Sequence, residues 1–144
     1  MPTPVSPPYR EMAEFRYQLR RFLRFSELAA PAAGLEPQQY LLLLALRGLP
    51  HWMRPTVGAL AERVQLRHHS TVELLDRLQR RGLVKRSRNL RDRRQILLRT
   101  TPRGERVLRR LAQHHRQALQ VVGPHLVRAL RAVLRHPARA GRGS

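Results

Sequence analysis

The amino-acid sequence predicts a mainly α-helical protein with one small β-hairpin. Apolar residues recur at spacings of three and four along most of the 144 residues, which is the period of an amphipathic helix. The pattern changes to that of strands only between residues 83 and 100. Eleven prolines mark boundaries, and none lies between Thr56 and Thr101, so this stretch is the continuous structured centre.

Two helices are predicted in the first third of the chain. The first spans residues 9–27 and is broken by Pro31 and Gly34. Its apolar stripe consists of Met12, Phe15, Leu19, Phe22 and Leu23. The second spans residues 37–47, because proline suits the first helical position and Gly48 suits the end. This helix is apolar almost all round, so we expect it to be buried.

The sequence pattern at the centre of the chain predicts a pair of short helices followed by a hairpin. Thr56 is a good N-cap for a helix over 57–64, and Gly82 ends another over 68–81. The inner stripe of the latter is Thr71, Leu74, Leu75 and Leu78. Residues 83–86 and 95–100 are strand candidates, joined by the basic loop 87–94.

The last third is again helical. Thr101 and Pro102 start a fifth helix, which we expect Gly123 and Pro124 to interrupt before a final helix reaches residue 135. We therefore expect one domain over 9–135 between disordered tails at 1–8 and 136–144. Within it, residues 9–34 and 102–135 flank a central lobe over 37–101.

Composition limits the kinds of partner and the location that we expect for the protein. There are 29 Lys and Arg against 9 Asp and Glu, a net charge of +20, which implies an anionic partner such as nucleic acid or an acidic membrane surface. The chain has no cysteine and no apolar run near the ~20 residues of a membrane span. Its first residues do not form a secretory signal, so we expect a cytoplasmic, nucleoid-associated protein.

Catalytic and metal sites find no support. Isolated glycines exclude a phosphate-binding loop, and paired acids are absent, so we expect no enzyme and no cofactor. His68-His69 and His114-His115 are adjacent pairs, which diverge by about 100° on a helix and do not chelate by themselves. We therefore expect no metal site, although a zinc-responsive regulator remains an alternative, because ligands could come from both chains of a dimer.

The order of elements favours DNA binding. Two short helices joined by a tight turn and followed by a basic hairpin form a winged helix-turn-helix lobe, whose second helix fits the major groove. Residues 85–99 contain seven basic residues and one acid, a net charge of +6.

This region is similar to the MarR family of transcriptional regulators. The matching motifs are Leu74-Leu75-Asp76-Arg77-Leu78, Gly82-Leu83-Val84, Asp92-Arg93-Arg94 and Thr101-Pro102-Arg103-Gly104. The resemblance covers about residues 9–135 and implies a regulator, often a repressor, that is an obligate homodimer. In that family the first helix and the last two pack across a two-fold axis, and a small aromatic anion often releases the DNA. It also implies that Asp92 braces the wing through an ion pair with an arginine.

The predicted lobe offers two sets of candidate DNA contacts, and a third set of residues could line an effector cavity. We expect the outward face of the fourth helix and its start to contact DNA bases and phosphates through Arg67, His68, His69, Ser70, Val72, Glu73 and Arg77. We expect the wing to contact backbone and minor groove through Arg88, Arg91, Arg93 and Arg94. An effector cavity would be lined by Phe22, Tyr40, His51 and Trp52, with Met53 beside them; packing in the core or a loop is the alternative for these residues.

Two other functions remain open. A non-specific, chromatin-organising nucleic-acid binder would also use the high charge, although the aromatic residues that stack on single strands are scarce. Peripheral membrane binding ranks lower, because the outer helices have stripes of ordinary core character. If the protein is the homodimeric DNA-binding regulator that the resemblance implies, its two-fold symmetry predicts a short, pseudo-palindromic operator on double-stranded DNA. The half-sites would lie about one helical turn apart.

Overall fold

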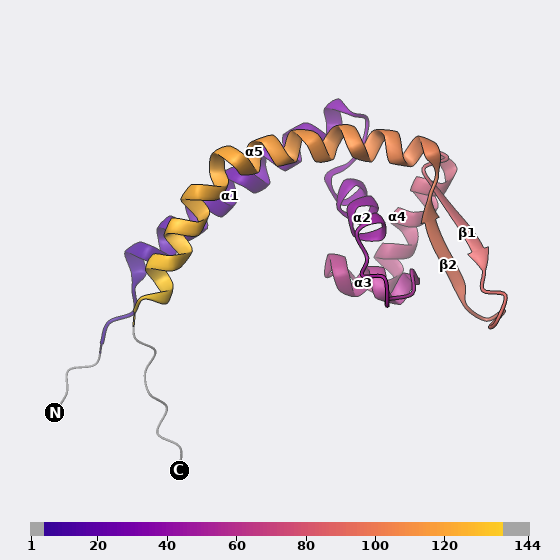
Figure 1. The fold of residues 1–144 in the computed structure, drawn as a ribbon, viewed down its shortest axis with the longest axis horizontal. Coiled ribbons are helices and arrows are strands. Elements are labelled where there is room, and N and C mark those ends of the chain that lie inside the picture. The colour runs from indigo at the N-terminus through magenta and orange to yellow at the C-terminus, as the bar shows by residue number, and fades with distance from the viewer. Residues whose placement is uncertain (1–4, 137–144) are drawn as a thin grey trace, which may run out of the picture. The chain divides into compact units, whose positions relative to one another are not determined.

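A computed structural model describes residues 5–136 as five helices and one two-stranded sheet (Figure 1). In chain order the elements are α1 (Tyr9–Ala32), α2 (Pro37–Arg47), α3 (Val57–Val64), α4 (His68–Arg80), β1 (Val84–Arg88), β2 (Ile96–Thr100) and α5 (Pro102–Leu134). The chain divides into two compact units, one over 27–114 and the other formed by the residues on either side of it. The predicted class, mainly α with a small hairpin, is confirmed.

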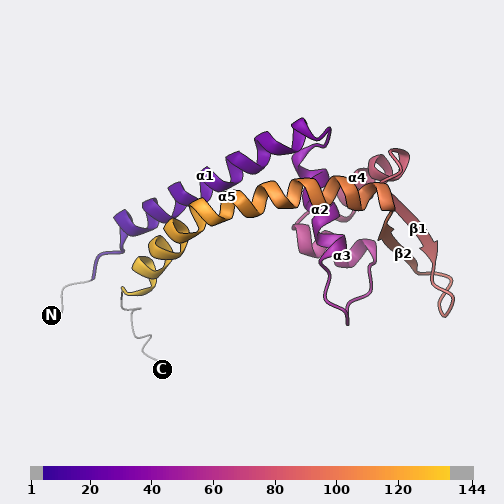
Figure 2. The same ribbon diagram turned by 45° about the horizontal axis from the view of Figure 1, so that its top comes forward.

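The central unit, residues 27–114, is a winged helix-turn-helix lobe. α2, α3 and α4 pack on one another and on the antiparallel hairpin, in which Val84 pairs with Thr100 and Arg88 with Ile96 (Figure 2). The core is built mainly from leucines: Leu42 and Leu43 of α2, Leu60 of α3, Leu74, Leu75 and Leu78 of α4, Leu83 and Leu98 beside or in the strands, and Leu108 and Leu111 of α5. The inner stripe predicted for residues 68–81 is therefore confirmed.

Capping residues explain where the central helices start and stop. The Thr56 side chain accepts a hydrogen bond from the backbone N–H of Ala59 at 3.2 Å, which starts α3. α4 ends where Gly82 adopts a φ of 71°, a left-handed conformation that costs other residues more. The Thr101 hydroxyl accepts from the N–H of Gly104 at 3.0 Å and donates to the carbonyl of Gly82 at 2.6 Å, so one side chain starts α5 and ties it to the end of α4.

Two predicted helix breaks are wrong. α1 continues through Pro31 to Ala32, and α5 is one helix that contains Pro124 instead of two helices. A proline inside a helix removes one backbone hydrogen bond at a cost of about 3 kcal/mol, and the turns on either side outweigh that loss.

Two smaller corrections concern the centre. β1 begins one residue later than predicted and reaches Arg88, and β2 begins at Ile96, so the loop is shifted to 89–95. α2 is not buried all round, because Leu41 and Leu44 are 47% and 42% exposed. The helix packs against neighbours on one side only, so apolar composition did not decide its burial.

The second unit pairs the first part of α1 with the last part of α5, in antiparallel directions. His136 lies 3.6 Å from the carboxylate of Glu11 at one end of the pair, and Phe22 and Phe25 meet His115 edge to face at the other, with ring centroids 6.4 and 6.0 Å apart. Within residues 5–136, no helix is long and apolar enough to cross a membrane.

Candidate nucleic-acid interface

The start of α4 presents a row of polar side chains on a fixed backbone. Thr71 is fully buried and its hydroxyl donates to the carbonyl of Arg67 at 3.0 Å, which anchors the first turn. Arg67 is the N-cap and makes no side-chain capping bond. The side chains predicted to face outward do so: His68, His69 and Glu73 are exposed, and Ser70 and Val72 are half-buried. This turn offers imidazole, hydroxyl, methyl and carboxylate groups, which are the groups that read base edges.

The wing loop is held by backbone groups and by the side chains of Asn89 and Asp92, so its arginine side chains take no part in shaping it. The N–H of Asn89 donates to the carbonyl of Gln95 at 2.9 Å, and the N–H of Arg91 donates to Oδ1 of Asn89 at 3.0 Å. Arg88, Arg91, Arg93 and Arg94 are exposed, and none of these four guanidinium groups forms an ion pair with any described residue. Four guanidinium groups on a short ordered loop are suited to phosphates and to a narrow minor groove.

Asp92 stabilises the wing through a hydrogen bond to the backbone and not through the ion pair with an arginine that the resemblance implied. Its Oδ1 accepts a hydrogen bond from the backbone N–H of Arg94 at 3.1 Å, and it takes part in none of the ion pairs among residues 5–136. An aspartate two residues before the donor forms a local turn of this kind readily. The expected ion pair is therefore replaced by a turn that needs only the backbone of Arg94.

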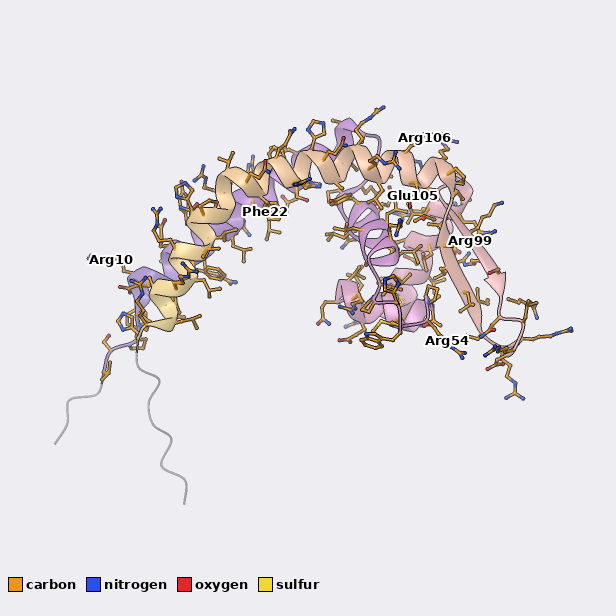
Figure 3. All side chains as sticks on the ribbon, viewed as in Figure 1. Arg10, Phe22, Arg54, Arg99, Glu105 and Arg106 are labelled. Atoms are coloured by element: carbon orange, nitrogen blue, oxygen red, sulfur yellow. The ribbon has the colours of Figure 1, made fainter. Side chains whose placement is uncertain are left out.

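Sequence reasoning missed the residues that attach the wing to the helices. Arg54 lies in the loop before α3 (Figure 3). It donates to Oε1 of Gln95 at 2.9 Å, and the N–H of Leu98 donates to the carbonyl of Pro55 at 2.8 Å. On the other side, Arg86 of β1 forms a 2.8 Å ion pair with Asp76 of α4. No local pattern reveals these pairs, because their partners are 10 to 43 positions apart in the chain. Asn89 did carry a signal, since asparagine favours such turns.

Leu90 was also missed. It is 97% exposed, on the wing loop between Asn89 and Arg91. A leucine this exposed on a basic loop is available to the apolar sugar edges of a groove.

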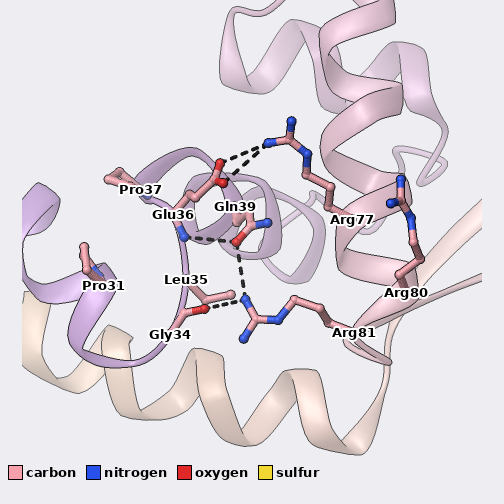
Figure 4. Close-up of a pocket in the computed structure, with 9 residues that line it drawn as sticks. All are labelled: Pro31, Gly34, Leu35, Glu36, Pro37, Gln39, Arg77, Arg80 and Arg81. Atoms are coloured by element: carbon pink, nitrogen blue, oxygen red, sulfur yellow. Dashed lines mark hydrogen bonds and ion pairs between the residues drawn. The ribbon is translucent and has the colours of Figure 1, made fainter.

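Arg77 does not lie with the start of α4. Its guanidinium is 3.3 Å from the carboxylate of Glu36, the residue before α2 (Figure 4). It lines a cavity together with Arg80 and Arg81, on the side of the unit where α1 is joined to α2. Of the predicted DNA contacts, this residue is the one that the structure separates from the others.

The four predicted effector-cavity residues are not brought together. Tyr40 is 3% exposed in the core of the central unit, where burial raises the pKa of its hydroxyl, whereas Trp52 is 80% exposed. Phe22 belongs to the other unit. His51 does line a cavity of about 260 Å³, and Met53, Leu98 and Arg99 line it as well.

The residues described by the structure include no group of three or more His, Cys, Asp or Glu side chains arranged to hold a metal ion.

Comparisons with known proteins agree with this arrangement. The sequence model of the MarR family matches residues 33–95, which include α2 to the end of the wing loop. No curated protein matches the chain. Among solved structures, a mutant of MepR from S. aureus bound to an oligodeoxyribonucleotide is 18% identical, with a TM-score of 0.64 and coverage of 83% of this chain and 89% of that one. BpsR from Bordetella bronchiseptica, whose DNA binding is regulated by 6-hydroxynicotinic acid, is 22% identical, with a TM-score of 0.65 and coverage of 83% and 92%. These two likenesses show the fold.

A third solved structure is more similar in sequence. The PcaV transcriptional regulator from Streptomyces coelicolor is 31% identical, with a TM-score of 0.58, and the match covers 82% of this chain and 87% of that one. Together with the match to the family model and the winged helix-turn-helix fold, this likeness shows that the chain belongs to the MarR family of transcriptional regulators.

Proposed function

We propose that this protein is a homodimeric, sequence-specific repressor that binds a pseudo-palindromic site on double-stranded DNA. Its family consists of transcription regulators with the winged helix fold, which gives the general function. The observation that carries the specific proposal is the placement of charge. The exposed start of α4 and the four free arginines of the wing belong to one lobe, joined through the bonds of Arg54 and Pro55 to the wing.

In this proposal α4 reads bases and the wing binds the backbone. The contacts come from Arg67, His68, His69, Ser70, Val72 and Glu73 in the major groove and from Arg88, Arg91, Arg93 and Arg94 at the wing. Arg77 contributes little, because it lies beside Glu36 on the other side of the lobe, away from the start of α4. The lobe over 37–101 thus binds DNA, and the helices over 9–34 and 102–135 form the dimer.

Exposed apolar side chains support the dimer. The paired parts of α1 and α5 leave many large hydrophobic residues between 39% and 71% exposed: Tyr9, Met12, Tyr17, Leu23, Phe25, Leu119, Val121, Val127, Leu130 and Leu134. Soluble proteins cover a concentration of this kind with another surface, and a second copy supplies the same residues by symmetry. We expect light scattering to give twice the chain mass for the wild type and about one chain mass for the double variant Val127→Glu/Leu130→Glu.

The control for the dimer experiment is the double variant Arg128→Glu/Arg131→Glu, which changes exposed residues on the same helix without adding charge to an apolar position. A wild-type protein that remains a monomer at micromolar concentration would contradict the dimer, and hence the palindromic site.

A small aromatic anion as effector also belongs to this proposal. The cavity lined by His51, Met53, Leu98 and Arg99 lies between the wing and the loop before α3. Two arginines line it, Arg47 and Arg99, and Arg47 is already paired with Glu105. An occupant would therefore touch both parts that must be aligned on DNA. BpsR provides the precedent for an aromatic acid in a protein of the same fold. We expect 6-hydroxynicotinic acid or benzoate to weaken operator binding by the wild type and not by Arg99→Gln.

The experiment for the main proposal is a footprint on genomic fragments, with an excess of competitor DNA and a series of salt concentrations. We expect one short protected palindrome and, in transcription with purified components, less product from the adjacent promoter. Equal affinity for all fragments and protection of long tracts would instead establish the chromatin-organising alternative, which the net charge of +20 also favours.

A further inference from the structure

The cavity beside Arg77 is lined by three arginines and has no part in the proposed DNA contacts. It measures about 550 Å³ and lies between the turn that joins α1 to α2 and the end of α4. Arg77 and Arg80 come from the last turn of α4, Arg81 follows it, and Glu36 and Gln39 come from the start of α2 (Figure 4).

The charge in this cavity is not balanced. Three guanidinium groups and one carboxylate line it, which leaves a net charge of +2. Arg77 lies 3.3 and 3.5 Å from the two oxygens of Glu36. Arg80 makes no hydrogen bond or ion pair with another side chain in the described part of the chain. Basic residues favour the last turn of any helix, but that preference does not require three of them to line one cavity.

Buried groups set the position of this cluster. Gln39 is only 4% exposed, and its Oε1 accepts from the N–H of Glu36 at 3.0 Å and from Arg81 at 3.5 Å. Arg81 also donates to the carbonyl of Gly34, whose φ of 77° turns the chain toward it. The site is therefore built on a buried amide and a fixed turn, so it needs little reorganisation to receive a ligand.

DNA is a poor occupant for this cavity. In the central unit, the hairpin tip and the start of α4 lie at one end, and the turn between α1 and α2 lies at the other (Figure 1). A duplex seated on the wing and the first turn of α4 does not reach both ends of the lobe.

We propose that this cavity binds a small oxyanion with two or more negative charges, a phosphate or a dicarboxylate. Arg80 provides the free guanidinium, and Arg77 divides its donors between Glu36 and the ligand. Planar guanidinium groups bind carboxylate and phosphate oxygens in pairs, and two charges on the ligand balance the net +2 of the site.

The test is calorimetric titration of the full chain with inorganic phosphate and with succinate, at constant ionic strength, and with acetate as the singly charged comparison. We expect saturable binding of at least one dianion and weaker binding of acetate. Arg80→Gln should weaken binding of that dianion by about tenfold or more, since a charged hydrogen bond is lost. Arg106→Gln removes the same charge from an exposed position outside the cavity and should leave the affinity unchanged.

A second pair of variants tests whether a negative charge within the cavity opposes binding of the ligand. Glu36→Gln removes the internal carboxylate that competes for Arg77, so it should strengthen binding, whereas Glu73→Gln, an exposed acid outside the cavity, should not. Preference for phosphate or for succinate decides between the two ligand classes. Neither Arg80 nor Glu73 has a side-chain partner among the described residues, and circular dichroism would verify that their variants are folded.

Three results would overturn the proposal. They are the absence of saturable binding, an equal loss in Arg80→Gln and Arg106→Gln, and a loss of duplex affinity in Arg80→Gln as large as that caused by changing the wing. The last result would assign the cluster to DNA. Because the titrations contain no DNA, their outcome does not depend on whether the protein is a sequence-specific repressor.

Discussion

Removing Arg91 and Arg94 from the wing should weaken DNA binding without affecting the fold. Both side chains are exposed, and the bonds that shape the loop use only the backbone N–H groups of these residues, at 3.0 and 3.1 Å from Asn89 and Asp92. Alanine keeps those N–H groups. The double variant Arg91→Ala/Arg94→Ala therefore isolates the contribution of the two guanidinium groups.

The size of the effect follows from counterion release. Each phosphate contact contributes about 0.9 to the slope of log affinity against log salt concentration, so the four arginines that the proposed dimer would carry contribute about 3.6. At about 0.15 M salt, that slope corresponds to a loss of about a thousandfold in affinity. If the two arginines contact phosphates alone, the loss should be similar for operator and unrelated duplexes.

The assay is fluorescence anisotropy with a labelled operator duplex over a series of salt concentrations. The control is Arg103→Ala/Arg106→Ala, which removes the same charge from exposed positions of α5 and should change the slope little. An unchanged slope in the wing variant would refute the assignment of the wing to DNA. An equal change in both variants would show that net charge alone, and not its location, determines affinity.

Three further predictions concern the fold. Gly104→Ala would place a Cβ 2.1 Å from the carbonyl oxygen of Leu83, so we expect a loss of about 2–3 kcal/mol in the free energy of unfolding by urea; a loss below the error of the measurement would mean that the backbones separate freely. Thr101→Ala removes the bonds to Gly82 and Gly104, at 2.6 and 3.0 Å, and should cost about 1–3 kcal/mol, whereas Thr101→Ser should recover most of this in the same measurement. Burial raises the pKa of Tyr40 above its ordinary value of 10.0, so the folded state holds this proton more tightly than the unfolded state. The contribution of Tyr40 to the free energy of unfolding should be constant below about pH 10 and fall as the pH rises above it, by at most about 1.4 kcal/mol per pH unit. Parallel curves of unfolding free energy against pH for the wild type and Tyr40→Phe would contradict this.

Local sequence predicted the individual elements well where a cap or a stop is a property of adjacent residues. Thr56, Gly82 and Thr101 mark boundaries of α3, α4 and α5, because each acts on backbone groups within a few positions. The same reasoning failed at Pro31 and Pro124. Whether a helix continues through a proline depends on how firmly the turns on each side are held, and a local rule does not contain that quantity.

The candidate site divides in the same way. The exposed start of α4 and the basic wing were predictable, because an apolar stripe fixes which residues of a helix face outward and because the loop composition is local. The effector cavity was not predictable, since Phe22, Tyr40 and Trp52 are aromatic residues that share only a residue type. Arg77 was assigned to DNA from its helical face alone, and the sequence does not show that Glu36, 41 positions earlier, lies beside it.

The sequence by itself thus determined the class of the fold, the order of its elements, the family and the concentration of positive charge on the wing. Helical and strand periods, caps and net charge are properties of neighbouring residues, so they can be read in one dimension. Only the tertiary structure decided which arginines lack an ion-pair partner among the described residues and which are grouped around a separate cavity. A guanidinium group acquires its role from the partner it meets, and the partners of Arg54, Arg77 and Arg81 are about 40 positions away in the chain.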